Sequence, residues 1–163
     1  MSSQEQKTAA GGQMLTFKLG DEIYGVDILR VKELRGWSPV TRLPHAEPHV
    51  LGVLNLRGAV VPIIDLRVRF ALASADFSPL TVIIVLSLRT ADGVRECGIV
   101  VDSVQDVVEI APQAIQPPPQ LGNTTRVQEF ISGIATVDDQ MLIVLDVDEL
   151  VGEDLAPAIA AVA

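Results

Sequence analysis

The chain is poor in aromatic side chains and in positive charge. Its 163 residues include only four Phe, one Trp and one Tyr, and 12 Lys and Arg stand against 21 Asp and Glu, for a formal net charge of -9. A negative chain repels polyanions, and so few aromatic rings cannot provide stacking platforms for bases. We therefore expect no nucleic-acid binding.

Long apolar runs and paired cysteines are also missing. The strongest apolar run, 80–86, is about one strand long and contains Thr81, whereas a membrane span needs roughly 20 apolar residues. Residues 1–12 are small and polar, without the apolar stretch of a signal peptide. We expect no direct membrane insertion and a cytoplasmic location.

The single Cys97 cannot form an internal disulfide, and its apolar neighbours predict a buried thiol.

Sequence patterns that carry catalysis are absent too. The chain contains no G-x-S-x-G nucleophile turn, no phosphate-binding glycine loop and no H-E-x-x-H zinc pattern. His45 and His49 lie four residues apart, but zinc requires further ligands and both histidines adjoin prolines. Four aspartates are better explained as turn and strand-end residues than as acid–base pairs: Asp27, Asp65, Asp102 and Asp146. We predict no catalytic residues, metal or cofactor. A small metal-dependent hydrolase or ligand-binding barrel is the alternative.

The abundant residues are β-branched aliphatics, 22 Val and 13 Ile. Such side chains favour a pleated, half-buried surface. Apolar runs between turn residues predict strands at 14–19, 22–26, 59–66, 80–88, 95–102, 104–110, 132–137 and 141–147. Residues 27–34 fit both helical and strand spacing, and we favour a turn followed by a strand through 36–43. We also expect a short helical connection over 46–51, a polyproline II connector at 117–119 and a helix over 148–162.

The two halves of the chain repeat. Adding 81 carries 52–56 onto 133–137 and 60–66 onto 141–147 without a gap, while an earlier pair, 26–28 and 101–103, is offset by 75. Gly52 recurs as Gly133 and Asp65 as Asp146, which indicates that these residues serve the fold. We therefore predict an all-β protein of two similar units, each of about five strands and closed or nearly closed.

The repeat also singles out one turn. Arg57-Gly58 in the first half corresponds to Asp138-Asp139 in the second, so the charge reverses at equivalent turns. The whole chain is asymmetric in the same sense, because residues 30–69 hold seven of the 12 basic residues and residues 102–163 hold eleven acids. An arginine on a tight turn presents a planar guanidinium, which is common among interface hot spots. Arg57 is therefore the sharpest candidate binding residue. The simpler alternative is that the acids only keep an apolar protein soluble.

Several segments resemble the CheW family of bacterial chemotaxis coupling proteins, over about residues 14–152. They are 24–36 (YGVDILRVKELRG), 40–44 (VTRLP) and above all 52–67 (GVLNLRGAVVPIIDLR), with agreement also at 98–102 and 133–147. The resemblance implies two SH3-like five-stranded β-barrels, intertwined and formed from about 14–70 and 80–147, with short helical connections and a C-terminal helix. Residues 1–13 are expected to form a disordered tail and 153–163 a helix end or tail.

The resemblance also implies a function and its residues. The family couples the cytoplasmic tips of methyl-accepting chemoreceptors to the regulatory domain of the histidine kinase CheA. The segment that matches the family's receptor-binding groove contains Val31, Glu33 and Leu34. Arg57 matches an arginine implicated in both receptor and kinase coupling, and the positions associated with the kinase contact match Val40 and Thr41.

Two further expectations concern partners. The charge asymmetry indicates contacts between unlike faces of barrels, which are heterologous and can join copies into rings. The sequence does not specify the signalling pathway. The alternative is an adaptor for a CheA-like kinase that controls non-flagellar motility or development.

Overall fold

Strands make up most of the regular structure, which we describe from a computed structural model. The structure describes residues 12–44, 47–72, 76–90, 93–117 and 130–150. The first half of the chain contains β1 (Gly12–Leu19), β2 (Glu22–Asp27), η1 (Ile28–Arg30), β3 (Val31–Gly36), β4 (Val50–Leu56), β5 (Ala59–Asp65) and α2 (Leu66–Arg69). The second half contains β6 (Val82–Thr90), β7 (Gly93–Val101), β8 (Ser103–Ile110), η2 (Pro112–Ala114), β9 (Ile131–Val137) and β10 (Gln140–Leu145).

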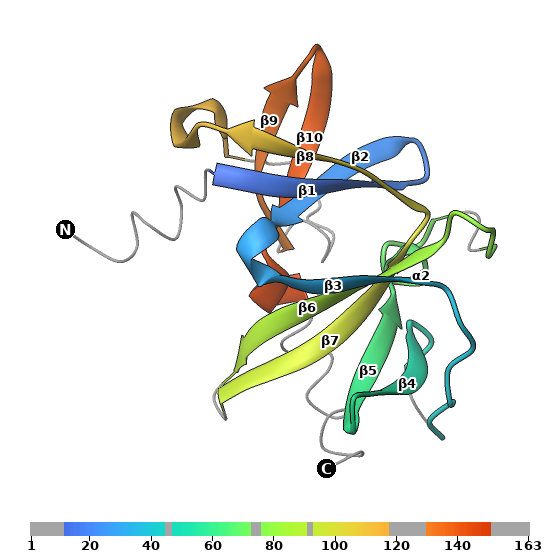
Figure 1. The fold of residues 1–163 in the computed structure, drawn as a ribbon. Coiled ribbons are helices and arrows are strands. Elements are labelled where there is room, and N and C mark those ends of the chain that lie inside the picture. The colour runs from blue at the N-terminus through green and yellow to red at the C-terminus, as the bar shows by residue number, and fades with distance from the viewer. Residues whose placement is uncertain (1–11, 45–46, 73–75, 91–92, 118–129, 151–163) are drawn as a thin grey trace.

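The strands form two five-stranded sheets that exchange hairpins between the halves of the chain. Sheet A has the order β8-β1-β2-β10-β9, and sheet B has the order β3-β6-β7-β5-β4. Figure 1 shows the exchange directly, because the blue strands β1 and β2 lie with the orange strands β9 and β10, while β3 lies with the green and yellow strands. The expected units, about 14–70 and 80–147, therefore differ from the sheets, since each unit contributes strands to both.

The two sheets have the same connectivity. Each sheet contains a hairpin from one half of the chain and three strands from the other half. In each sheet, the second strand of the hairpin pairs in parallel with the strand that comes last in sequence among those three. This parallel pair is β7 with β5 in sheet B and β2 with β10 in sheet A. The remaining neighbours are antiparallel. The sequence repeat is thus also a repeat of topology.

An isolated backbone bridge joins the two edges of each sheet. In sheet B the chain leaving β3 reaches Thr41, which exchanges hydrogen bonds of 3.0 and 2.8 Å with Val53 of β4. In sheet A the chain leaving β8 reaches Gln116, which exchanges bonds of 2.9 and 2.8 Å with Ile134 of β9. Because these strands are the first and last of each order, the bridges curl the sheets into barrels and leave few free edges. The expected pair of SH3-like five-stranded barrels is confirmed.

The recurring glycines lie at these two bridges. A Cβ atom on Gly52 would lie 2.1 Å from the carbonyl oxygen of Thr41, and one on Gly133 would lie 2.9 Å from that of Gln116. Gly52 also has a φ of 152°, which is available almost only to glycine. The prediction that both residues serve the fold is confirmed: they let two backbones approach where each barrel closes.

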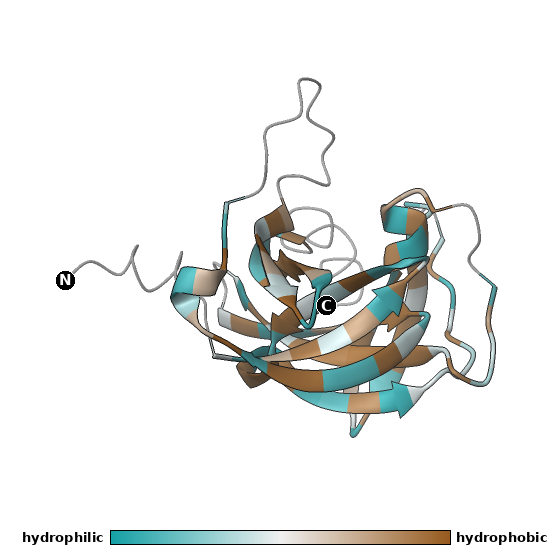
Figure 2. Cartoon of the chain, turned by 90° about the horizontal axis from the view of Figure 1, so that it is seen from above, coloured by the Kyte–Doolittle hydropathy of each residue, from teal (hydrophilic) through white to brown (hydrophobic). Residues whose placement is uncertain are grey.

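The hydrophobic core is shared between the barrels. The largest apolar cluster joins Phe17 and Val26 of sheet A to Leu86 and Ile99 of sheet B. Each barrel also has a smaller core of its own, one around Ile63, Ile83 and Val100, and the other around Met14, Leu142 and Val144. Figure 2 shows hydrophobic stretches along the strands of the barrels. In β6, successive residues face different cores, because Ile83 packs in the smaller core of sheet B and Ile84 packs in the shared core. Burial across the interface fixes the barrels against each other.

Three boundaries differ from expectation. β1 begins at Gly12, which lies opposite Ile110, so the tail expected at 1–13 is wrong for its last two residues, and residues 1–11 lie outside the described part. The strand expected through 36–43 ends at Gly36, because Pro39 lacks the N–H that a ladder requires. The helical connection expected over 46–51 is also wrong, since Val50 already begins β4 and lies opposite Ile64.

Other expected segments are only partly within the described residues. The helix expected from Asp148 begins at Val147 and is described as far as Leu150, while 151–163 lie outside the described part. Residues 118 and 119 of the proline connector and His45 also lie outside the described part of the chain.

Candidate functional site

The turn between β4 and β5 holds Arg57 in a fixed, exposed position. Leu56 lies opposite Ala59, so Arg57 and Gly58 form a two-residue hairpin turn, and both have positive φ, 53° and 86°. The amide of Gly58 donates a 3.0 Å hydrogen bond to Oδ1 of Asn55, which ties the turn to its own strand. The Arg57 side chain is 67% exposed. A two-residue hairpin turn of this type requires positive φ at both positions, and the equivalent residues of sheet A, Asp138 and Asp139, have it too.

Arg57 reaches across the mouth of the barrel to Glu33 on β3. Its Nη1 lies 2.6 Å from Oε1 of Glu33, and Nη1 of Arg35 lies 3.3 Å from Oε2 of the same carboxylate. The guanidinium of Arg57 lowers the pKa of Glu33, burial opposes this effect, and Arg35 adds to the lowering. Glu33 therefore stays ionised at neutral pH and holds two guanidinium groups.

This ion pair is a second closure of sheet B. β3 and β4 are the two edge strands of that sheet, and the pair joins β3 to the turn that follows β4. One carboxylate between two guanidinium groups leaves a net positive charge at the mouth of the barrel. The site can therefore bind an acidic partner surface.

The predicted receptor-binding residues lie together on β3 but not on one face. Val31 and Glu33 are partly buried, whereas Leu34 is 48% exposed, as expected from the two-residue period of a strand. Val31 packs against the large shared core. Val31 is therefore partly structural, and Leu34 presents its side chain to the surface on the face of β3 opposite Glu33.

The predicted kinase-side residues lie where sheet B closes. Thr41 is exposed and joins β4 through its backbone, and Val40 packs against the smaller core of sheet B. The bridge partner of Thr41 is Val53, and Val53 lies on β4, the strand that leads to Arg57. All of the predicted site residues are thus on sheet B, near its two edges.

Two residues that shape this site escaped the sequence analysis. Arg35 is the second partner of Glu33, and Asn55 accepts the turn hydrogen bond from Gly58. Glu33 and Arg35 are two residues apart on one strand, so their side chains share a face, and this spacing could have indicated that Arg35 pairs with Glu33. The spacing of Asn55 and Gly58, three residues apart around the turn, was a signal for the second.

A buried arginine supports the far end of sheet B and was also missed. Arg67 is fully buried and pairs with both oxygens of Asp65, at 2.9 and 3.0 Å, and with Oδ1 of Asp102 at 3.1 Å. The other oxygen of Asp102 accepts a 2.8 Å hydrogen bond from the amide of Gly20 in the β1–β2 turn. The network thus joins sheet B to sheet A. Its composition is typical of a satisfied structural ion pair rather than of a catalytic group.

The four aspartates considered for chemistry serve turns and helix ends, as predicted. Asp27 accepts from the amide of Leu29, Asp65 from that of Arg67, and Asp146 from that of Glu149. Within the described residues, no group of three or more His, Cys, Asp and Glu side chains could hold a metal ion. Cys97 is buried, and burial raises the pKa of its thiol.

The family follows from comparison with known proteins. The family model described as "CheW-like domain" matches residues 13–154. The chain belongs to the CheW family. A protein of Klebsiella aerogenes named "Chemotaxis protein CheW" is 42% identical over 144 residues, which cover 88% of this chain and 84% of that protein. A "Probable chemotaxis protein CheW" of Rhizobium etli is 37% identical and covers 86% of this chain and 88% of its own length.

A solved structure agrees with this CheW-family assignment. The scaffolding protein TtCheW from Thermoanaerobacter tengcongensis has a TM-score of 0.77 and 31% sequence identity, and the match covers 86% of this chain and 92% of that one. The relatives are thus named as chemotaxis proteins and, for the solved structure, as a scaffolding protein. In the described part of the chain, no helix is long and apolar enough to span a membrane.

Proposed function

We propose that the protein is a non-catalytic adaptor that couples the cytoplasmic tips of methyl-accepting chemoreceptors to the histidine kinase CheA. The observation that carries the proposal is Arg57, exposed on a rigid turn and braced by Glu33 in a CheW-family chain. Arg57 has five N–H donors in a fixed fork, and Glu33 occupies one side of it. The remaining donors are available to a partner.

The proposed receptor contact is on the β3 side of sheet B. Leu34 is 48% exposed, and Leu29, in the turn between the two barrels, is 84% exposed. A helical hairpin binds by placing apolar side chains into such a surface, with charged groups at the rim to fix its register. Val31 contributes packing under the surface, and Glu33 and Arg57 contribute the rim.

The proposed kinase contact is on the adjoining edge of sheet B. Thr41 is exposed and Val40 supports it from the core, next to the strand that carries Arg57. A barrel of the kinase regulatory domain would bind here without any chemical step. The adaptor would then hold receptor and kinase at high effective concentration in one geometry.

The proposal includes a location and contacts between copies. The protein would be cytoplasmic and recruited to receptor arrays, and copies would contact each other through unlike faces. The net charge of -9 combined with a basic stretch over 30–69 supports such contacts, because one end of a copy attracts the opposite end of the next.

The test is capture of a receptor cytoplasmic fragment and of CheA by the wild type and by Arg57→Glu. Reversing the charge places two carboxylates at the mouth of the barrel, so we expect binding to weaken about tenfold or more, together with loss of receptor-dependent kinase activation. Lys18→Glu makes the same charge change on β1 of sheet A and should bind as the wild type. Circular dichroism must show that both variants are folded. Unchanged capture by folded Arg57→Glu would refute the role of Arg57, and failure of the wild type to capture either partner would refute the adaptor proposal.

A further inference from the structure

The segment η1, where the chain crosses from sheet A to sheet B, is held in place by Arg30. Ile28 packs against the shared core, whereas Leu29 is 84% exposed. Nε of Arg30 donates a 2.9 Å hydrogen bond to the carbonyl oxygen of Ser87 on β6, and its Nη2 donates to Oδ1 of Asp148. Arg30 therefore ties the crossing to β6 and to the segment that follows β10.

Asp148 lies on a helical turn that is itself firmly anchored. Val147 and Leu150 of this turn are buried in the shared core. Oδ1 of Asp148 also accepts a 2.9 Å hydrogen bond from the amide of Arg89 on β6. Figure 1 shows the turn, in red, next to η1. Asp148 is thus a fixed acceptor, and the position of Arg30 depends on it.

The repeat shows that this ion pair is one of two equivalent pairs. Arg67 follows the hairpin strand β5 as Asp148 follows the hairpin strand β10, and the two positions differ by the repeat length of 81 (148 − 67). Arg67 pairs with Asp102, where the chain returns to sheet A, and Asp148 pairs with Arg30, where the chain leaves sheet A. Each crossing therefore has an ion pair to the same position of the repeat, with the charges exchanged.

The two ion pairs differ in burial and in their neighbours. Arg67 is fully buried, whereas the side chains of Arg30 and Asp148 are 19% and 29% exposed. Arg30 is also the residue between Leu29 and Val31, which both belong to the proposed receptor contact. Among the described residues, Leu29 is the most exposed of the large apolar side chains. The Arg30–Asp148 pair is thus placed to control how this apolar side chain is presented.

We propose that Asp148 is a positioning residue for receptor binding, which acts by holding Arg30 and with it η1. The inference rests on the proposed receptor contact and adds to it a residue from the other end of the chain. Without the pair, η1 keeps the 2.9 Å hydrogen bond from the Leu29 amide to Asp27 but loses its tie to the turn after β10. Only a fraction of the molecules then presents Leu29 correctly, and the apparent Kd for the receptor rises in inverse proportion to that fraction.

Calorimetric titration with a receptor cytoplasmic fragment tests the inference. Asp148→Asn keeps an acceptor oxygen for the Arg89 amide but removes the charge that faces Arg30. We expect its affinity to fall about three- to tenfold, as when η1 is correctly placed for about a third to a tenth of the time. Arg30→Met should weaken binding at least as much, and the double variant should bind as Arg30→Met alone, because the two residues act as one unit.

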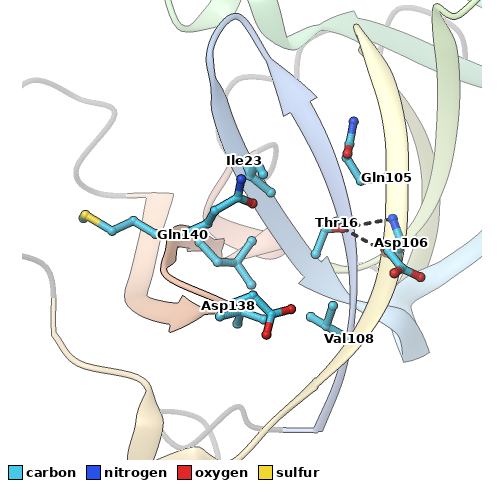
Figure 3. A pocket seen from close by; sticks show the side chains of 10 residues that line it. Thr16, Ile23, Gln105, Asp106, Val108, Asp138 and Gln140 are labelled. Carbon is cyan, nitrogen blue, oxygen red and sulfur yellow. Dashed lines mark hydrogen bonds between the residues drawn. The ribbon is translucent and has the colours of Figure 1, made fainter.

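Two variants control for the loss of a carboxylate. Glu149→Gln makes the corresponding change at the next residue, whose side chain is exposed, and should bind the receptor as the wild type. Asp138→Asn makes the change at the other end of β10, since Asp138 is on the turn before this strand, as Figure 3 shows, and Asp148 follows it. It should also leave receptor affinity unchanged.

Two further measurements separate positioning from a general loss of stability. The affinity of Asp148→Asn for CheA should equal that of the wild type, because the proposed kinase contact at Val40 and Thr41 is on another part of sheet B. In NMR relaxation of the free protein, the backbone order parameters of Leu29 and Arg30 should fall in Asp148→Asn, while that of Thr41 should not change.

The inference is overturned if folded Asp148→Asn binds the receptor as tightly as the wild type, or if η1 keeps its order parameters. Equal weakening of receptor and CheA binding, or equal weakening by Glu149→Gln, would also overturn it, because the effect would then not be specific to η1. A wild type that does not bind the receptor refutes both this inference and the adaptor proposal. Wild-type binding that Asp148→Asn fully retains refutes this inference alone.

Discussion

Replacing Gly52 by Ala should show how much of the stability of the fold depends on barrel closure. The new Cβ would lie 2.1 Å from the carbonyl oxygen of Thr41, a backbone atom, so relief requires the strand itself to move. The left-handed φ of 152° adds about 1–3 kcal/mol of strain. Displacing Thr41 also weakens its two hydrogen bonds to Val53, each worth about 1 kcal/mol net.

Together these effects predict that Gly52→Ala lowers the free energy of unfolding by about 3–5 kcal/mol, a large part of the roughly 5–15 kcal/mol of a typical domain. The assay is urea unfolding followed by far-ultraviolet circular dichroism. Gly58→Ala is the matched control: its φ is also positive, 86°, but its Cβ would meet nothing within 4 Å, so it should lose only about 1 kcal/mol. Equal losses in the two variants would show that the close approach at Thr41 does not limit stability.

The remaining predictions concern two charged groups. Arg67→Met should lower the free energy of unfolding by about 3–5 kcal/mol, because it leaves the buried Asp65 carboxylate unpaired, and adding Asp65→Asn should restore part of the loss; urea unfolding of both variants checks this, and a stable single variant would contradict it. NMR titration should find the pKa of Glu33 below about 4.3 in the wild type and higher in Arg57→Ala. The depressed pKa means that the ion pair stabilises the folded state above about pH 4.3 and that this contribution is lost as the pH falls through the folded-state pKa.

The sequence predicts local pairing well because apolar alternation and turn residues are local properties. It identifies the hairpins, the repeat and the closing glycines. It does not show which barrel each hairpin joins, since this depends on packing between distant segments. The chain passes from sheet A to sheet B through η1, three residues long, and returns through Asp102 alone. Neither junction has a pattern that specifies the direction of the crossing.

The candidate site was predictable to a similar degree. Arg57 is visible because it departs from the repeat, at a turn whose partner has the opposite charge. Its contact with Glu33 joins residues on strands that are not neighbours in the sheet, so no spacing rule reveals it. Arg67 was overlooked because an isolated arginine after a strand is ordinarily solvated, and its burial depends on Asp102 from the other half of the chain.

The exchange of hairpins sets an order of events for a growing polypeptide. Sheet B has all of its strands once residue 101 has been made, whereas β1 and β2 must wait for β8, β9 and β10. From Asp27 to Leu145, the end of β10, the ribosome adds 118 residues (145 − 27), which takes roughly 6–24 s at about 5–20 residues per second. During this interval the first hairpin exposes Met14, Leu15 and Phe17, which are buried in the finished protein. The N-terminal hairpin is therefore the segment most in need of protection during synthesis.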